Sequence, residues 1–107
     1  MLFTRSSAQA DRPIIPPGQP MAGPGMWVWY TPTKVADQDK MINDLRRSGM
    51  KTVFIKSGDG LHTWKQFNQV LVDRLHRAGI HVCAWHYVYG DQPLREALVS
   101  AYAYKQG

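Results

Sequence analysis

Apolar residues in this chain occur in two patterns, helical stripes and short continuous runs. A stripe at helical spacing predicts a helix over about 36–48, which Gly49 would end in a left-handed turn. The run 52–56 that follows is almost continuously apolar, as in a strand covered on both faces. The sequence therefore predicts a helix that leads directly into a buried strand. The residues of the stripe are Met41, Ile42 and Leu45.

This helix and strand form a unit that is repeated at an offset of 30 residues. Segment 47–51 is echoed by segment 77–81, and Lys56 falls opposite His86. A unit that recurs in this way cannot bury its apolar face alone and must share a core with its neighbours. The repeat predicts stacked βα units, with function in the loops that follow the strands.

The remaining elements fit the same scheme. The aromatic and β-branched run 26–30 predicts a first strand. A second helix is predicted over about 64–77 and a third strand over 82–88. The stripe of the second helix consists of Phe67, Val70, Leu71 and Leu75.

A last helix is expected after the third strand. Asp91 would be its N-cap, and Pro93 would lie in its first turn. Its apolar spacing predicts which side chains face the core. These are Leu94, Ala97, Leu98 and Ala101.

Strands and helices thus alternate along the chain. Parallel neighbours cannot be joined by hairpins, so this order predicts a parallel sheet with right-handed crossovers. The fold class is therefore α/β, with parallel βαβαβα units over 26–107. Residues 1–25 are rich in proline and glycine and predict an irregular arm or linker.

Length and charge narrow the class of protein. The chain has 107 residues, 44% of them hydrophobic, which suits one domain with a core. Its net charge is +5, but the basic residues gather near the predicted helix ends, where they complement the helix dipole. No basic stripe with interleaved aromatic residues is present, so a nucleic-acid partner is not expected. The residues at the helix ends are Arg46, Arg47, Lys51, Arg74 and Arg77.

Several other classes of site lack a signature. No apolar run is long enough for a membrane span, and Cys83 lies in an apolar run as an inert buried thiol would. His81 and His86 would point to opposite faces of one strand, so no metal site is expected. Phosphate-binding and dinucleotide-binding motifs are absent, and no cofactor is expected. The location of the protein stays open, with a secreted or cell-envelope protein among the options.

The residues that follow the predicted strands are polar and aromatic. Ligands of parallel α/β folds bind beyond the carboxyl ends of the strands, where such residues meet. Aromatic rings with a few convergent polar groups are what a sugar site needs, because sugar faces stack on rings while hydroxyl groups bind donors and acceptors. The residues are Tyr30, Lys56, Ser57, Asp59, Trp85, His86, Tyr87, Tyr89 and Asp91.

Structural roles compete with this interpretation. Lys56 would also be explained by a side chain that reaches solvent, and His86 by a satisfied core histidine. Asp59 lies between two glycines and would also suit a turn that binds its own loop.

Three segments, 54–60, 77–80 and 82–87, resemble the opening units of bacterial TIM-barrel glycoside hydrolases. They are similar to family 25 lysozyme-type muramidases, whose second strand commonly reads I-K-A-T-E-G and whose third reads G-A-Y-H-F. The resemblance implies a partial TIM barrel of about three of the eight units and a parent protein that acts on a polysaccharide such as peptidoglycan. It also implies that Lys56, Asp59, His86 and Tyr87 line the sugar groove.

From these considerations Asp59 is the candidate catalytic residue, with Trp85 and Tyr89 as further sugar contacts. Family 25 members carry an aspartate on the first strand, whereas 25–29 has no acid here. Their Asp-x-Glu pair would lie on a fourth strand. We therefore expect this chain alone to be inactive, because glycoside hydrolysis needs one protonated and one ionised carboxyl group.

Two alternatives remain open. One is a carbohydrate-binding or scaffolding relative without turnover, and the other is a small flavodoxin-like module complete in itself. In the barrel interpretation, self-association or a missing C-terminal half would cover the open strand edges.

Overall fold

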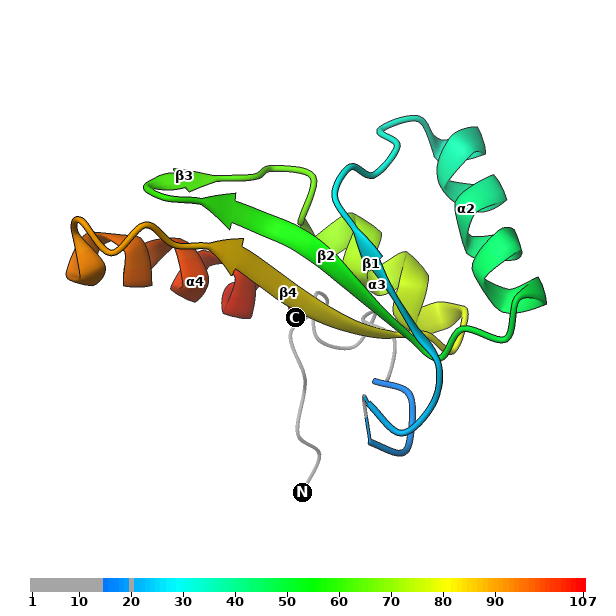
Figure 1. Cartoon of the computed structure of the whole chain (residues 1–107). Helices are drawn as coiled ribbons and strands as arrows, with labels where there is room; N and C mark the ends of the chain where they lie inside the picture. The colour runs from blue at the N-terminus through cyan, green and yellow to red at the C-terminus, as the bar shows by residue number, and fades with distance from the viewer. Residues whose placement is uncertain (1–14, 20) are drawn as a thin grey trace, which may run out of the picture.

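The computed structural model of the chain describes residues 15–19 and 21–107 (Figure 1). Three helices and a four-stranded mixed sheet form an α/β fold. Of the expected arm over 1–25, residues 1–14 and 20 lie outside the described part. In chain order the elements are β1 Gly25–Val28, α2 Val35–Arg47, β2 Thr52–Asp59, β3 His62–Thr63, α3 Gln69–Arg77, β4 His81–Tyr87 and α4 Pro93–Lys105.

The sheet is built around β2. Strands β1 and β4 pair with it in parallel on its two sides, so that Val53 lies between Met26 and Val82. This confirms the parallel arrangement of the three predicted strands. The two-residue strand β3 was not predicted, and it pairs antiparallel with Gly58 and Asp59 at the end of β2.

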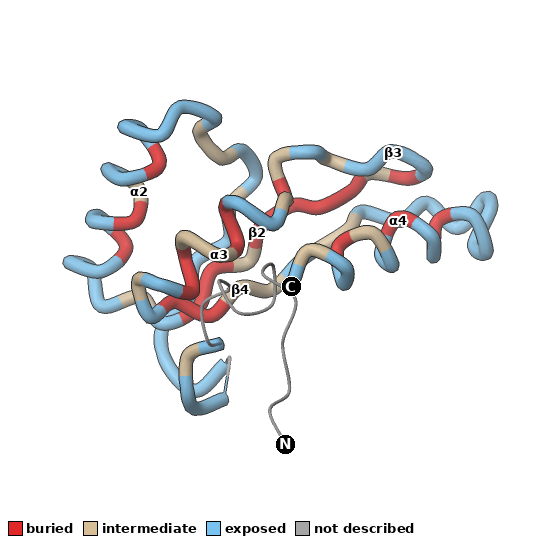
Figure 2. The backbone as a smooth tube through the Cα atoms, turned by 180° about the vertical axis from the view of Figure 1, so that it is seen from behind, coloured by how far each residue is buried: buried red, intermediate tan, exposed pale blue. Residues whose placement is uncertain are grey.

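All three helices contribute to one hydrophobic core on one face of the sheet. Val53 and Ile55 of β2 are buried in it, together with Leu45 of α2, Leu75 of α3 and Ala103 of α4. Figure 2 shows the buried positions gathering along β2 and α3. Because side chains alternate along a strand, Phe54 and Lys56 point to the opposite face, which carries no helix.

Helix α3 begins five residues later than the sequence predicts. Asn68 caps it by accepting a hydrogen bond from the Leu71 amide at 3.0 Å, and the preceding residues form a turn. Phe67 and Leu71 are buried as expected, whereas Val70 is exposed and Val72 takes its place in the core. The N-cap asparagine fixes the start of the helix because its side chain binds a free backbone N–H group.

Helix α4 packs on the sheet with the face opposite to the one predicted. The four residues expected to face the core are all exposed, and Glu96, Val99 and Ala103 are buried instead. Asp91 is not the N-cap either, since Gln92 occupies that position. The exposed residues are Leu94, Ala97, Leu98 and Ala101.

The buried carboxylate of Glu96 explains this orientation. Its two oxygens accept backbone hydrogen bonds from Tyr89, Gly90 and Gln92 at 2.9 to 3.3 Å. These bonds hold the loop between β4 and α4 against the first turn of the helix. A carboxylate with three charge-assisted bonds is better placed inside this loop than in a solvent-facing position that would leave those amides unpaired.

Strand β2 contains a β-bulge near its end. Lys56 is the register partner of Trp85, but the next residue of β4, His86, is opposite Gly58. One extra residue, Ser57, is thus inserted in β2, and its hydroxyl donates to the Trp85 carbonyl at 3.2 Å. The bulge reverses the side-chain alternation, which brings Lys56 and Asp59 to the same face although they are three residues apart.

Replacement of Gly58 by alanine tests the packing at this bulge. An added Cβ would lie 2.3 Å from Cγ1 of Val99 and 2.9 Å from Cδ2 of His86. We expect Gly58→Ala to lower the free energy of unfolding by about 1–3 kcal/mol, the usual cost of overpacking, in urea denaturation. Gly49→Asn is the control, because nothing lies within 4 Å of a Cβ there and asparagine tolerates its φ of 73°. Equal losses for both variants would contradict the close packing of Gly58.

Candidate functional site

The face of the sheet without helices is covered by aromatic rings. The Trp27 ring stacks on Phe54 with centroids 4.7 Å apart, and Trp85 meets Trp27 at 5.8 Å and Trp29 at 5.1 Å. Trp27 and Trp29 are 66% and 49% exposed. We call this surface the aromatic face; it comprises Trp27, Trp29, Phe54, Lys56, Asp59, Trp64, Trp85 and Tyr87.

The ammonium group of Lys56 lies inside a cage of tryptophan rings. Its Nζ atom is 3.8 Å from the ring centroid of Trp29, 4.1 Å from that of Trp64 and 5.2 Å from that of Trp85. All three distances are within the range of cation–π attraction. The side chain is 1% exposed, so Lys56 does not reach solvent as a surface lysine would.

Asp59 is the carboxylate partner of this lysine. Its Oδ2 atom accepts from Lys56 Nζ at 2.6 Å, and its Oδ1 atom accepts from the Tyr89 hydroxyl at 2.7 Å. The hydrogen bond from Lys56, followed by that from Tyr89, lowers the pKa of Asp59 below its usual range. The hydrogen bond between Tyr89 and Asp59 raises the pKa of Tyr89, because loss of the phenol proton would leave two negative charges in contact. Asp59 is therefore ionised at neutral pH, with a partly exposed carboxylate.

Gln66, which the sequence did not single out, joins the ends of the strands. Its side-chain amide donates to the carbonyls of Trp29 at 2.7 Å and Lys56 at 3.0 Å, and its oxygen accepts from the Thr31 amide at 2.8 Å. These bonds hold the end of β1 beside β2 and keep Trp29 over Lys56. Trp64 was also missed; the predicted helix included it, although it belongs to the turn before α3.

A pocket of about 290 Å³ opens beside Asp59, between the β2–β3 hairpin and the start of α4. Tyr89 and Asp91 also line it. Tyr87 lies next to Tyr89, with ring centroids 5.1 Å apart. Polar and aromatic groups therefore continue from the aromatic face into this pocket.

His86 lies on the other face of the sheet, toward α4. Its Nε2 atom is 2.8 Å from the Gly60 carbonyl, which only accepts, so Nε2 carries a hydrogen. Its Nδ1 atom is 3.1 Å from the Ser100 hydroxyl. Lys56 and His86 lie on the neighbouring strands β2 and β4, but their side chains point to opposite faces of the sheet, so the expectation that they meet is wrong. His86 thus has the contacts of a satisfied histidine between layers and does not line the aromatic face.

The other sequence-based expectations concern single residues and classes of site. Cys83 is only partly buried, and this burial raises the pKa of its thiol. Among residues 15–19 and 21–107, no three His, Cys, Asp or Glu side chains gather in a group that would hold a metal ion. Within the same residues, no helix has the length and apolar character needed to cross a bilayer.

Comparison of the chain with protein-family models, curated proteins and solved structures finds no match.

The three bonds to Glu96 should make stability depend on pH. The hydrogen bond from the Tyr89 amide is the main cause of the lowered pKa of Glu96 in the folded chain. In the unfolded chain the Glu96 carboxyl group binds a proton more readily, with its ordinary pKa of about 4.3. The stabilisation is therefore present at neutral pH and is lost as pH falls through the pKa of Glu96 in the folded chain. We expect Glu96→Gln to be less stable than the wild type at pH 7 and the difference to disappear in acid.

Urea denaturation between neutral pH and strong acid measures this difference. Asp91→Asn removes one negative charge from the loop that Glu96 holds, but Asp91 accepts none of the three amide bonds, so its loss of stability should be much smaller. A constant difference between wild type and Glu96→Gln across the whole pH range would show that the charge of Glu96 does not matter.

Proposed function

We propose that this chain is part of a glycoside-hydrolase-like (β/α) barrel that binds a polysaccharide, such as peptidoglycan, across the aromatic face. The observation that carries this proposal is the pairing of exposed tryptophan rings with one ionised carboxylate on the same face. Trp27 and Trp29 offer flat surfaces for sugar rings. Asp59 offers an acceptor for hydroxyl groups at the edge of that surface.

The sheet topology supports a barrel over a flavodoxin-like module. Strands β1, β2 and β4 lie side by side in chain order, and the helices pack on one face. A doubly wound fold reverses its strand order and carries helices on both faces, whereas a barrel keeps its helices outside and its strand interior free of them. In a barrel the aromatic face would be the interior and its Asp59 end the sugar-binding rim.

Asp59 suits one of the two carboxyl roles in glycoside hydrolysis. An ionised carboxylate acts as nucleophile or stabilises positive charge on the sugar. The nearby Glu96 also has a lowered pKa and is held by backbone amides, so it does not supply the proton. Neither of these two carboxylates therefore supplies a proton, and the chain alone is expected to bind without turnover.

Binding is tested by Trp27→Ala. We expect this variant to weaken binding of soluble peptidoglycan or chitin fragments by about 2- to 10-fold in calorimetry, the loss of one stacking contact. Trp27 is largely exposed, so the fold should persist. The control is Tyr104→Ala, which removes an exposed ring from α4, away from the aromatic face. Equal binding by the wild type and Trp27→Ala would contradict the proposal.

Catalysis is tested separately by Asp59→Asn. We expect no release of reducing sugar by the wild-type chain, and weaker glycan binding by Asp59→Asn because the charged acceptor is lost. Product release that disappears in Asp59→Asn would instead favour a complete hydrolase. Tyr89→Phe serves as a control for geometry, since it removes one hydrogen bond to Asp59 and keeps the charge.

A further inference from the structure

The outer side of α4 carries an apolar stripe that nothing in the described chain covers. Leu94 and Leu98 are 86% and 70% exposed, and Ala101 continues the same line along the helix. Lys105 ends this line, and Arg95 flanks its start. Residues spaced by three and four positions share one side of a helix, so these five side chains form one apolar and basic surface, which we call the α4 stripe.

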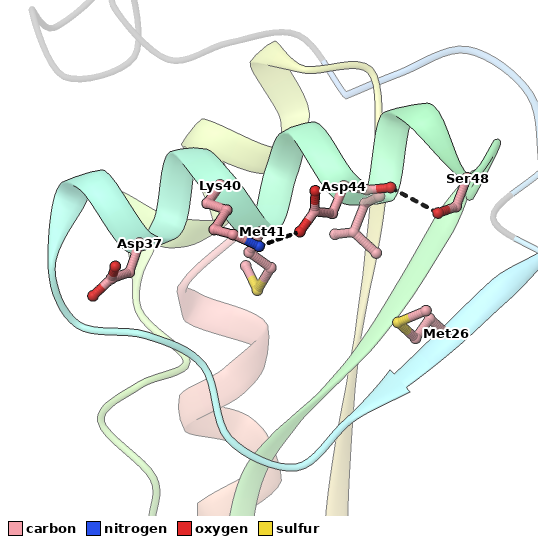
Figure 3. Close-up of a pocket in the computed structure, with 7 residues that line it drawn as sticks. Met26, Asp37, Lys40, Met41, Asp44 and Ser48 are labelled. Carbon is pink, nitrogen blue, oxygen red and sulfur yellow. Dashed lines mark hydrogen bonds and ion pairs between the residues drawn. The ribbon is translucent and has the colours of Figure 1, made fainter.

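An apolar groove with an acidic rim lies at the other end of the molecule. It has a volume of about 350 Å³ and runs between β1 and α2 (Figure 3). Met26 of β1 and Met41 of α2 form its apolar part, and Asp37 and Asp44 lie along its rim. Lys40 pairs with Asp44 at 3.0 Å, which leaves the groove with one net negative charge.

These two surfaces are complementary, because one is an apolar helix face with basic ends and the other is an apolar groove with an acidic rim. A helix that presents leucines at four-residue spacing is the usual occupant of an apolar groove. The basic ends of the α4 stripe, Arg95 and Lys105, are about 15 Å apart along the helix, and Asp37 and Asp44 are about 10 Å apart along theirs. Long basic side chains bridge the difference, so both can approach acidic groups when the leucines fill the groove.

We infer that the groove between β1 and α2 binds the α4 stripe of a second copy of this chain. Within one molecule the contact is impossible, because α2 and α4 lie at opposite ends of the sheet (Figure 1). Two different surfaces meet in this contact, so it joins copies head to tail unless two contacts close a reciprocal dimer. Association buries the exposed leucines, and the opposite charges select the partner surface.

The test uses two variants that each damage one surface. Leu94→Glu with Leu98→Glu changes only exposed positions of the α4 stripe, and Asp37→Lys with Asp44→Lys reverses the acidic rim of the groove. Sedimentation velocity of the wild-type chain should show self-association that grows with concentration and weakens in high salt, where the screening length falls to about 3 Å. Each variant should raise the apparent dissociation constant by about tenfold or more.

Mixing the two variants gives the decisive measurement. The rim variant keeps an intact α4 stripe and the helix variant keeps an intact groove, so together they have one working contact. An equimolar mixture should form a one-to-one heterodimer that grows no further. Val70→Glu is the matched control, since Val70 on α3 is 67% exposed and lies on neither surface; it should associate like the wild type.

Three outcomes would overturn the inference. These are a wild-type chain that stays monomeric at millimolar concentration, variants that associate as strongly as the wild type, and a mixture that forms no heterodimer. Circular dichroism of each variant shows whether its helices are intact. Recovery of association in the mixture independently shows that both variants fold.

Discussion

The buried ammonium group of Lys56 is the constraint on which the sheet and the candidate site depend. Removal of a charge from water costs several kcal/mol unless the protein replaces the lost hydration. Here Asp59 supplies the opposite charge at 2.6 Å, and the rings of Trp29 and Trp64 supply cation–π attraction. Each of these partners has to be held in place, because an unpaired lysine at this depth would destabilise the fold.

Three features of the chain serve that requirement. The bulge at Ser57 turns Asp59 to the face of Lys56, and Gly58 lets α4 approach the bulged strand closely. Gln66 fixes the end of β1, from which Trp29 extends over the ammonium group. Because the cage is filled by the lysine itself, an incoming ligand meets the outer surfaces of the rings and the free part of the Asp59 carboxylate. This favours a neutral ligand that stacks and accepts or donates hydrogen bonds.

The helices and the parallel strands could be predicted from the sequence because the signals for them are local. Gly49 and Gly79 end helices with φ values of 73° and 81°, and the apolar run after Gly49 is the central strand. The turn before α3 was misread as helix, since Trp64 and Phe67 fit a helical stripe while the N-cap bond of Asn68 decides the start. The hairpin with β3 was not predicted, because β3 has two residues, too few to show a hydrophobic pattern.

The candidate site could be predicted only in part, because both the bulge in β2 and the pairing of β2 with β4 depend on contacts between strands. Alternation along a strand predicts faces correctly until one residue is inserted, and then every later prediction is reversed. Lys56 and His86 were expected together because the repeat aligns them, yet the pairing of β2 with β4 differs from the repeat by one residue, so Lys56 is opposite Trp85 and His86 points to the other face. No local signal in the sequence marks this insertion except the glycine at 58.

Helix α4 shows how one polar contact can override an apolar pattern. Its leucines give the stronger helical stripe, and burying them would have been the simplest arrangement. Glu96 lies on the opposite side, however, and its carboxylate holds the loop that carries Tyr89 to Asp59. The helix therefore buries the acid that organises the candidate site and leaves Leu94 and Leu98 outside. The exposed stripe is a consequence of how the candidate site is built, which connects the aromatic face to the surface inferred to join two copies.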